Sequence, residues 1–135
     1  MLERIIITAT IIGLGTLAYA GGLSLQKRRV RAQAATSPLL RDLNPGIPAI
    51  LYFWSEMCVP CKTVQEPALE RLEAALGQDG IRVIAIDAIQ NVELADQWSV
   101  MSTPTTIVLD GMKQPRFINN RPAPFAELLE QVTTL

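Results

Sequence analysis

A run of 22 consecutive uncharged residues, Ile5 to Gln26, constrains the fold of this 135-residue chain more than any other feature. The run lies between Arg4 and Lys27 and consists largely of Ile, Leu, Ala and Gly. A helix rises about 1.5 Å per residue, so the run reaches about 33 Å, enough for a hydrocarbon core of about 30 Å. It has no amphipathic stripe, which argues against a buried helix of a soluble protein. We therefore predict that residues 1–26 form one transmembrane anchor.

A cleaved signal peptide is the main alternative to this anchor. Ala18-Tyr19-Ala20 matches the small-x-small pattern of a cleavage site after an apolar run. Against cleavage, four basic residues follow the run: Lys27, Arg28, Arg29 and Arg31. Basic residues beside a membrane segment tend to stay in the cytoplasm. We expect an uncleaved single-pass anchor with the rest of the chain in the cytoplasm, and its alternative is an extracytoplasmic domain. Residues 27–44 then form a basic linker and entry segment.

Charge and composition exclude several classes of protein. Residues 1–36 carry five basic and one acidic residue, whereas residues 37–135 carry seven basic and twelve acidic ones. The net charge of −1 argues against binding to nucleic acid. A hydrophobic fraction of 49% excludes general disorder. The absence of histidine excludes Ser-His, Cys-His and His-metal chemistry within the chain, and two cysteines are too few for a disulfide-stapled scaffold.

Residues 45–135 form a single domain in which strand and helix patterns alternate. Ala49–Trp54 is a nearly continuous apolar run, typical of a strand that is buried on both faces. Further strands are expected at 81–87, 105–109 and 116–119, and helices at about 64–76, 92–98 and 125–132. Pro67 should kink the first of these helices, and Gly77 or Gly80 should end it. This order predicts an α/β fold with a mixed central sheet and helices on both faces.

The two cysteines, in Cys58-Val59-Pro60-Cys61, lie between the first predicted strand and the first predicted helix. At a helix amino terminus, free backbone N–H groups and the helix dipole stabilise an anion. A thiolate placed there has a pKa lowered to between about 3.5 and 7.5. Pro60 suits the first helical turn, where its missing N–H costs nothing. We expect both sulfurs on that turn, with Cys58 as the exposed nucleophile and Cys61 as the more buried resolving thiol.

Other interpretations of the cysteine pair have less support. A zinc site needs about four ligands, which two cysteines without histidine do not supply, so no metal site is expected. A purely structural disulfide gains little by closing so short a loop. Two inert buried thiols do not account for a motif that coincides with a strand end and a helix start.

Two segments resemble the thioredoxin family. Phe53 to Lys62, with the sequence FWSEMCVPCK, is similar to the active-site segment of that family. Thr103-Pro104-Thr105 begins 42 residues after Cys61 and matches its second signature, a cis-proline loop that faces the cysteines. The resemblance covers about residues 45–135. It implies a thioredoxin-like fold and thiol–disulfide exchange.

The same resemblance implies roles for the neighbours of the cysteines. Trp54 would pack beside the site, although simple filling of the core explains this residue equally well. Pro104 would be cis, and the backbone of Thr103 would pair with a substrate strand. Val59 and Pro60, between the cysteines, would support the active site and contact the substrate.

Three positions depart from the best-known pattern of the family. Val59 stands where Gly is common and Met57 where Trp is usual. Tyr52 stands in the place of a buried Asp that is thought to take the proton of the resolving cysteine. Cys61 must therefore give its proton to water or to a neighbour such as Glu56 or Lys62.

The sequence as a whole predicts a membrane-tethered disulfide reductase. Without a His between the cysteines, we expect a reducing to intermediate potential. The expected substrate is a protein disulfide, and exchange needs no organic cofactor. An external reductant must restore the dithiol: a thioredoxin-reductase-like system in the cytoplasm, or a membrane electron carrier outside it. The alternative is a redox-inactive docking module with the same fold, held at the membrane by residues 5–26.

Overall fold

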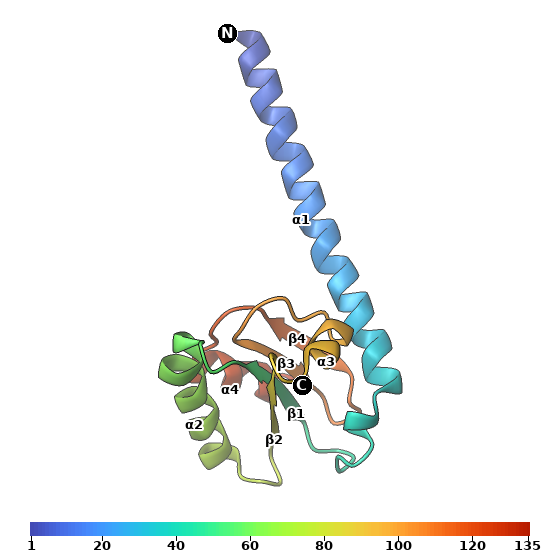
Figure 1. Ribbon diagram of the computed structural model, residues 1–135, viewed down its shortest axis with the longest axis vertical. Coiled ribbons are helices and arrows are strands. Elements are labelled where there is room, and N and C mark those ends of the chain that lie inside the picture. The colour runs from blue at the N-terminus through green and yellow to red at the C-terminus, as the bar shows by residue number, and fades with distance from the viewer.

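The elements follow the order that the sequence pattern predicts (Figure 1). This computed structural model describes all residues from 1 to 135. Its helices and strands are α1 (Leu2–Thr36), β1 (Ala49–Trp54), α2 (Glu66–Leu76), β2 (Arg82–Asp87), α3 (Val92–Gln97), β3 (Thr105–Leu109), β4 (Pro115–Asn119) and α4 (Phe125–Thr133). A short 3₁₀ turn at Pro38–Leu40 follows α1, and a π-helical turn at Cys61–Gln65 precedes α2. Gly77, with φ +70°, ends α2 in the left-handed region that favours glycine.

The four strands form one mixed sheet in the order β2-β1-β3-β4. β1 pairs in parallel with β2 and antiparallel with β3, which in turn pairs antiparallel with β4. Four positions therefore lie at one end of the sheet: Trp54, Asp87, Thr105 and Asn119. We call this the cysteine end, because Cys58 follows β1 there. The expected mixed sheet with helices on both faces is confirmed.

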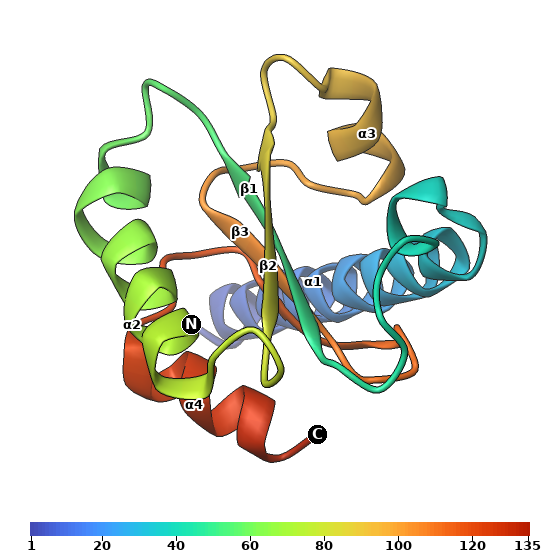
Figure 2. The ribbon, with the colours of Figure 1, turned by 90° about the horizontal axis from the view of Figure 1, so that it is seen from below.

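Each face of the sheet carries its own buried cluster, as the alternation of side chains along β1 requires. Leu51 and Phe53 point to the face covered by α3 and the C-terminal part of α1. Ile50 and Tyr52 point to the face covered by α2 and α4, which also buries both cysteines. Figure 2 shows these two pairs of helices on opposite sides of the strands.

The segment expected to be a linker is folded instead. α1 continues without a break to Thr36, so the first ten residues of the predicted linker, 27–36, are helical. Val30 and Ala34 are buried in the cluster under α3, one helical turn apart on the same side of α1. Their burial stabilises the helix there, although basic side chains surround them in sequence. Two residues of the basic segment thus belong to the domain core, and its first ten residues form a helix where a linker was expected.

The other end of α1 stands free of the domain (Figure 1). It holds an 18-residue window with a mean hydropathy of 1.7, none of which is buried in the structure. This is the one helix that is long and apolar enough to cross a membrane, by length and composition.

Candidate functional site

The two cysteines lie at the cysteine end of the sheet, where the chain leaves β1 and enters a helix. They form a disulfide with a Cα–Cα distance of 5.3 Å. Cys58 is 7% exposed, whereas Cys61 is fully buried. Cys58, expected to be exposed, is thus almost fully buried while the pair is oxidised, although it remains the more accessible of the two cysteines.

The backbone around Cys58 suits a negatively charged sulfur. Helical structure begins at Val59, so the free N–H groups of the first turn are close to the Cys58 side chain. The Cys61 N–H donates a hydrogen bond to Cys58 Sγ at 3.2 Å. A hydrogen bond to the charged form of an acid favours that form. Reduction of the disulfide would therefore leave Cys58 as the thiol that this backbone stabilises as a thiolate.

A distorted turn connects the cysteines to α2. The kink expected at Pro67 takes the form of the π-helical turn Cys61–Gln65, in which the Glu66 N–H donates to the Cys61 carbonyl. Pro67 has no N–H to continue the regular pattern, and its ring crowds the preceding turn. Gln65 is fully buried and holds this turn to the chain ahead of α4, because its side chain exchanges two hydrogen bonds with the backbone of Ala123.

A second loop meets the cysteines at the same end of the sheet. The Thr103–Pro104 peptide bond is cis, as the family resemblance implies. Pairing of Phe53 with Thr105 brings this loop beside the end of β1. Ser55 Oγ lies 3.3 Å from Thr103 Oγ1 and joins the two loops by a hydrogen bond. Sequence analysis missed Ser55, because a serine next to a strand gives no local sign of a partner 48 residues away.

The residues predicted to support the site fall into two groups. Trp54 is half-buried and packs against the cluster that contains both cysteines. Pro104 is buried and Thr103 is half-buried. By contrast, Val59 and Pro60 are exposed on the helix start. The site thus combines a packed interior with an open apolar rim.

The side chain of Tyr52 contacts the backbone of the resolving cysteine, Cys61. Its hydroxyl lies 3.5 Å from the Cys61 carbonyl oxygen. Burial raises the pKa of Tyr52 above its ordinary value, and the nearby Glu66 carboxylate raises it further through its charge and a hydrogen bond. A phenol with a raised pKa stays protonated, so Tyr52 cannot take a proton from the Cys61 thiol. Glu56, which the sequence suggested for that task, is exposed.

No group of three or more His, Cys, Asp or Glu side chains is placed to hold a metal ion. The chemistry that these residues can perform on their own is the exchange of one disulfide for another.

Comparison with known proteins agrees with this geometry. The family model described as Thioredoxin matches residues 40–133. The chain is 42% identical to thioredoxin of Bacillus subtilis over 57 residues, which is 42% of this chain and 53% of that protein. It is 37% identical to thioredoxin 2 of Plasmodium berghei over 88 residues, 64% of this chain and 55% of that protein. The chain thus spans about half the length of the curated relatives it matches.

Solved structures show the same fold. A structure described as thioredoxin-2, "a component of malaria parasite protein secretion machinery", has a TM-score of 0.62 and 25% identity. The match covers 66% of this chain and 84% of that one. A DsbF homologue of Corynebacterium diphtheriae has a TM-score of 0.60 at 21% identity, over 71% of this chain and 76% of that one. The fold is the expected thioredoxin-like fold, and the chain belongs to the thioredoxin family.

Proposed function

We propose that this chain is a membrane-tethered thiol–disulfide oxidoreductase that reduces protein disulfides through Cys58 and Cys61. The observation that carries this proposal is the cysteine pair at a helix start, beside a cis-proline loop. Cys58 is the more accessible of the two cysteines, and its Sγ accepts a hydrogen bond from the Cys61 N–H. Family membership supports the same chemistry.

The proposed reaction has two balanced steps. The Cys58 thiolate attacks one sulfur of the substrate disulfide, forms a mixed disulfide and releases the other sulfur as a thiolate. Cys61 then loses its proton and attacks Cys58 Sγ, which forms the Cys58–Cys61 disulfide and releases the second substrate thiolate. Two electrons pass from the cysteine pair to the substrate. An external dithiol reductant returns the pair to the reduced state.

The loops beside the cysteines are proposed to bind the substrate. The backbone of Thr103 faces the incoming chain, and its side chain is held by Ser55. Val59 and Pro60 offer exposed apolar contacts next to Cys58. Trp54 supports the site from the buried side.

The membrane attachment is proposed from the free, apolar part of α1. Residues 5–26 would cross the bilayer once, and residues 45–135 would carry the chemistry. The four basic residues from Lys27 to Arg31 favour a domain on the cytoplasmic side. A protease added to inverted vesicles would then remove a carboxy-terminal tag. Protection of the tag would place the domain on the other side.

A redox titration of the full chain in detergent micelles tests the proposed function. The protein is equilibrated in glutathione or dithiothreitol buffers, and the fluorescence of Trp54 and Trp98 is followed, with Cys58→Ser as the control. We expect one reversible two-electron transition in the reducing to intermediate range, absent from the control. If no disulfide forms reversibly, the redox proposal fails and a docking module is the better interpretation.

A further inference from the structure

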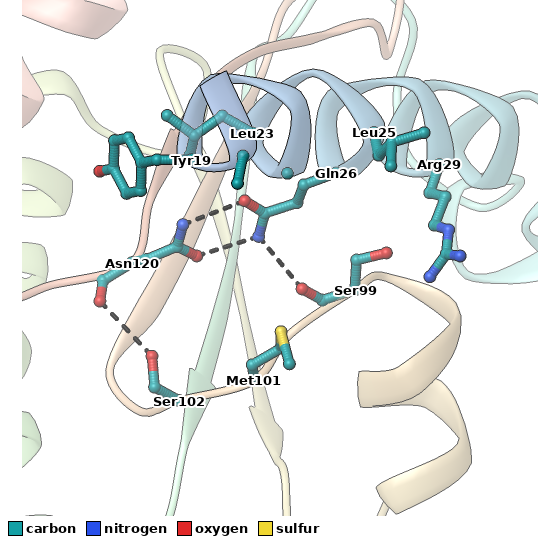
Figure 3. Close-up of a pocket in the computed structure, with 11 residues that line it drawn as sticks. Tyr19, Leu23, Leu25, Gln26, Arg29, Ser99, Met101, Ser102 and Asn120 are labelled. Atoms are coloured by element: carbon teal, nitrogen blue, oxygen red, sulfur yellow. Dashed lines mark hydrogen bonds between the residues drawn. The ribbon is translucent and has the colours of Figure 1, made fainter. Parts of the chain in front are cut away.

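α1 holds the domain in a fixed position relative to the apolar run. Gln26 is the last residue of that run. Its Nε2 donates hydrogen bonds to the Ser99 carbonyl and to Asn120 Oδ1, each at 3.1 Å. Asn120 returns a hydrogen bond to Gln26 Oε1, also at 3.1 Å. Figure 3 shows this set of bonds between the helix and the two loops. Val30, one turn further on, is fully buried in the domain core. No free segment separates the run from the domain.

These contacts lie at the cysteine end of the sheet. Asn120 follows the last residue of β4, and Ser99 begins the loop that leads through Thr103 and Pro104 into β3. The free part of α1 therefore leaves the domain from contacts at the cysteine end. Figure 1 shows it rising above the domain, away from the turn between β3 and β4. The turn that holds Met112 connects β3 to β4 at the opposite end.

The position of the charged residues along α1 determines where the surface of the bilayer meets the domain. The uncharged run ends at Gln26, and Lys27 follows directly, so lipid headgroups meet the chain at the hydrogen bonds just described. The loop from Ser99 to Thr103 then lies at headgroup level. Large apolar side chains are exposed at this end of the domain: Met57, Val59, Ile89 and Met101.

A groove lies at this level, between the helix and the domain. It has a volume of about 570 Å³ and lies between α1 and the loop that precedes Thr103. Tyr19 and Leu23 line it from the helix, and Met101 and Ser102 from the loop (Figure 3). Its wall is mostly apolar, and Ser102, which lines it, precedes Thr103 in the loop that is proposed to bind substrate.

We infer that the substrates of this protein are disulfides in integral membrane proteins, in segments that lie beside the bilayer that holds α1. A chain anchored in the same bilayer reaches the cysteine end of the domain from the side of the membrane and presents its disulfide to Cys58. This inference rests on the proposed function, because it needs both the membrane anchor and the exchange reaction.

A depth measurement tests the orientation without using the reaction. A fluorophore is attached at Met101→Cys or Met112→Cys in the full chain, with both native cysteines replaced by Ser, in vesicles of phosphatidylcholine. The two positions are matched, because both are exposed methionines, at 95% and 83%. Headgroup-spin-labelled lipid should quench the label at position 101 several-fold more than the label at 112. Equal or reversed quenching would overturn the inference and leave the proposed chemistry intact.

A substrate series tests the class of partner. The Cys61→Ser variant, which traps mixed disulfides, is reconstituted with a model transmembrane helix that carries a disulfide-closed loop. The loop either follows the helix directly or follows a flexible spacer of about 40 residues, which reaches roughly 35 Å. We expect the near loop to be trapped about tenfold faster, as a higher effective concentration at Cys58 requires.

Two controls distinguish failure of the inference from failure of the proposed function. A Gly/Ser linker of about 12 residues between Leu25 and Gln26 frees the domain over roughly 19 Å and should abolish the preference for the near loop. Equal trapping of near and far loops by the unmodified anchor overturns the inference. A small soluble aromatic disulfide reports exchange separately. If it reacts with Cys58 while the near loop does not, only the inference fails. If neither reacts, the proposed function fails and the inference with it.

Discussion

The two faces of the sheet are completed in different ways. The face under α2 and α4 is built from residues within the family match and buries both cysteines. The opposite face is closed by α3 and by Val30 and Ala34 of α1, which precede the matched region. One face therefore carries the chemistry, and the other makes the stability of the domain depend on the helix that leads to the proposed anchor.

The largest expected effect is the loss of turnover when either cysteine is replaced. Cys58→Ser should reduce turnover of a soluble disulfide to background, because the attacking sulfur is lost. Cys61→Ser should also stop turnover but should leave a mixed disulfide on Cys58. Mass spectrometry of the full chain after reaction with the disulfide distinguishes the two variants. Equal adduct formation by both would show that Cys58 is not the nucleophile.

Replacement of one valine on each face compares the two cores directly. Val30→Ala and Val108→Ala each remove two methyl groups from a fully buried position. We expect each to lower the free energy of unfolding by about 2 kcal/mol, the scale for a shortened core side chain. Urea unfolding in detergent, followed by tryptophan fluorescence, measures both. Arg31→Ala, on an exposed part of α1, is the control and should change little. A loss near zero for Val30→Ala alone would show that α1 does not complete its face.

Ionisation of Tyr52, on the cysteine face, should make the free energy of unfolding depend on pH. Its pKa is raised in the folded chain, while the unfolded chain ionises near pH 10. The folded state therefore keeps a proton that the unfolded state loses above about pH 10. Stability should be independent of this group below that pH and should then fall by up to about 1.4 kcal/mol per pH unit. Unfolding titrations between pH 8 and about 11 measure this slope. Tyr52→Phe should flatten it, and an unchanged slope would exclude Tyr52 as the source.

The smallest expected effect concerns the contact between α1 and the loops at the cysteine end. Gln26→Ala removes three hydrogen bonds to Ser99 and Asn120 at a partly exposed position. We expect a loss of about 1 kcal/mol, the scale of an ordinary hydrogen-bond deletion. Exchange with a soluble disulfide should not change, because Gln26 is not part of the cysteine site. A fall in that rate would mean that α1 acts on the site itself.

The core of the fold could be predicted because its strands are short, apolar and bounded by turn residues. The predicted limits of 49–54 and 105–109 match β1 and β3. The helical segment 27–36 was not predicted, because its basic residues suggest a solvated tether. Val30 and Ala34 are spaced as one helical side, but their partner surface is formed by Trp98 and other residues far along the chain. A local pattern does not contain such a contact.

The candidate site divides in the same way. The motif around Cys58 and Cys61 is continuous in sequence, and its place between strand and helix follows from the local pattern. The hydrogen bonds that hold the motif in place join residues that are far apart in the sequence. Ser55 meets Thr103, and Gln65 meets Ala123, across 48 and 58 residues. The contact of Glu66 with Tyr52 was also missed, because the π-helical turn changes which side chains share a helical face.

The unbroken course of α1 has a mechanical consequence. A helix that crosses a bilayer tilts to match the thickness of the hydrocarbon layer. Because Val30 and Ala34 fix the domain to this helix, a change in the tilt of the proposed anchor would turn the whole sheet through the same angle. In a membrane of shorter acyl chains the site would lean toward one side of the helix and away from the other. Acyl-chain length would then select which neighbouring proteins come within reach of Cys58.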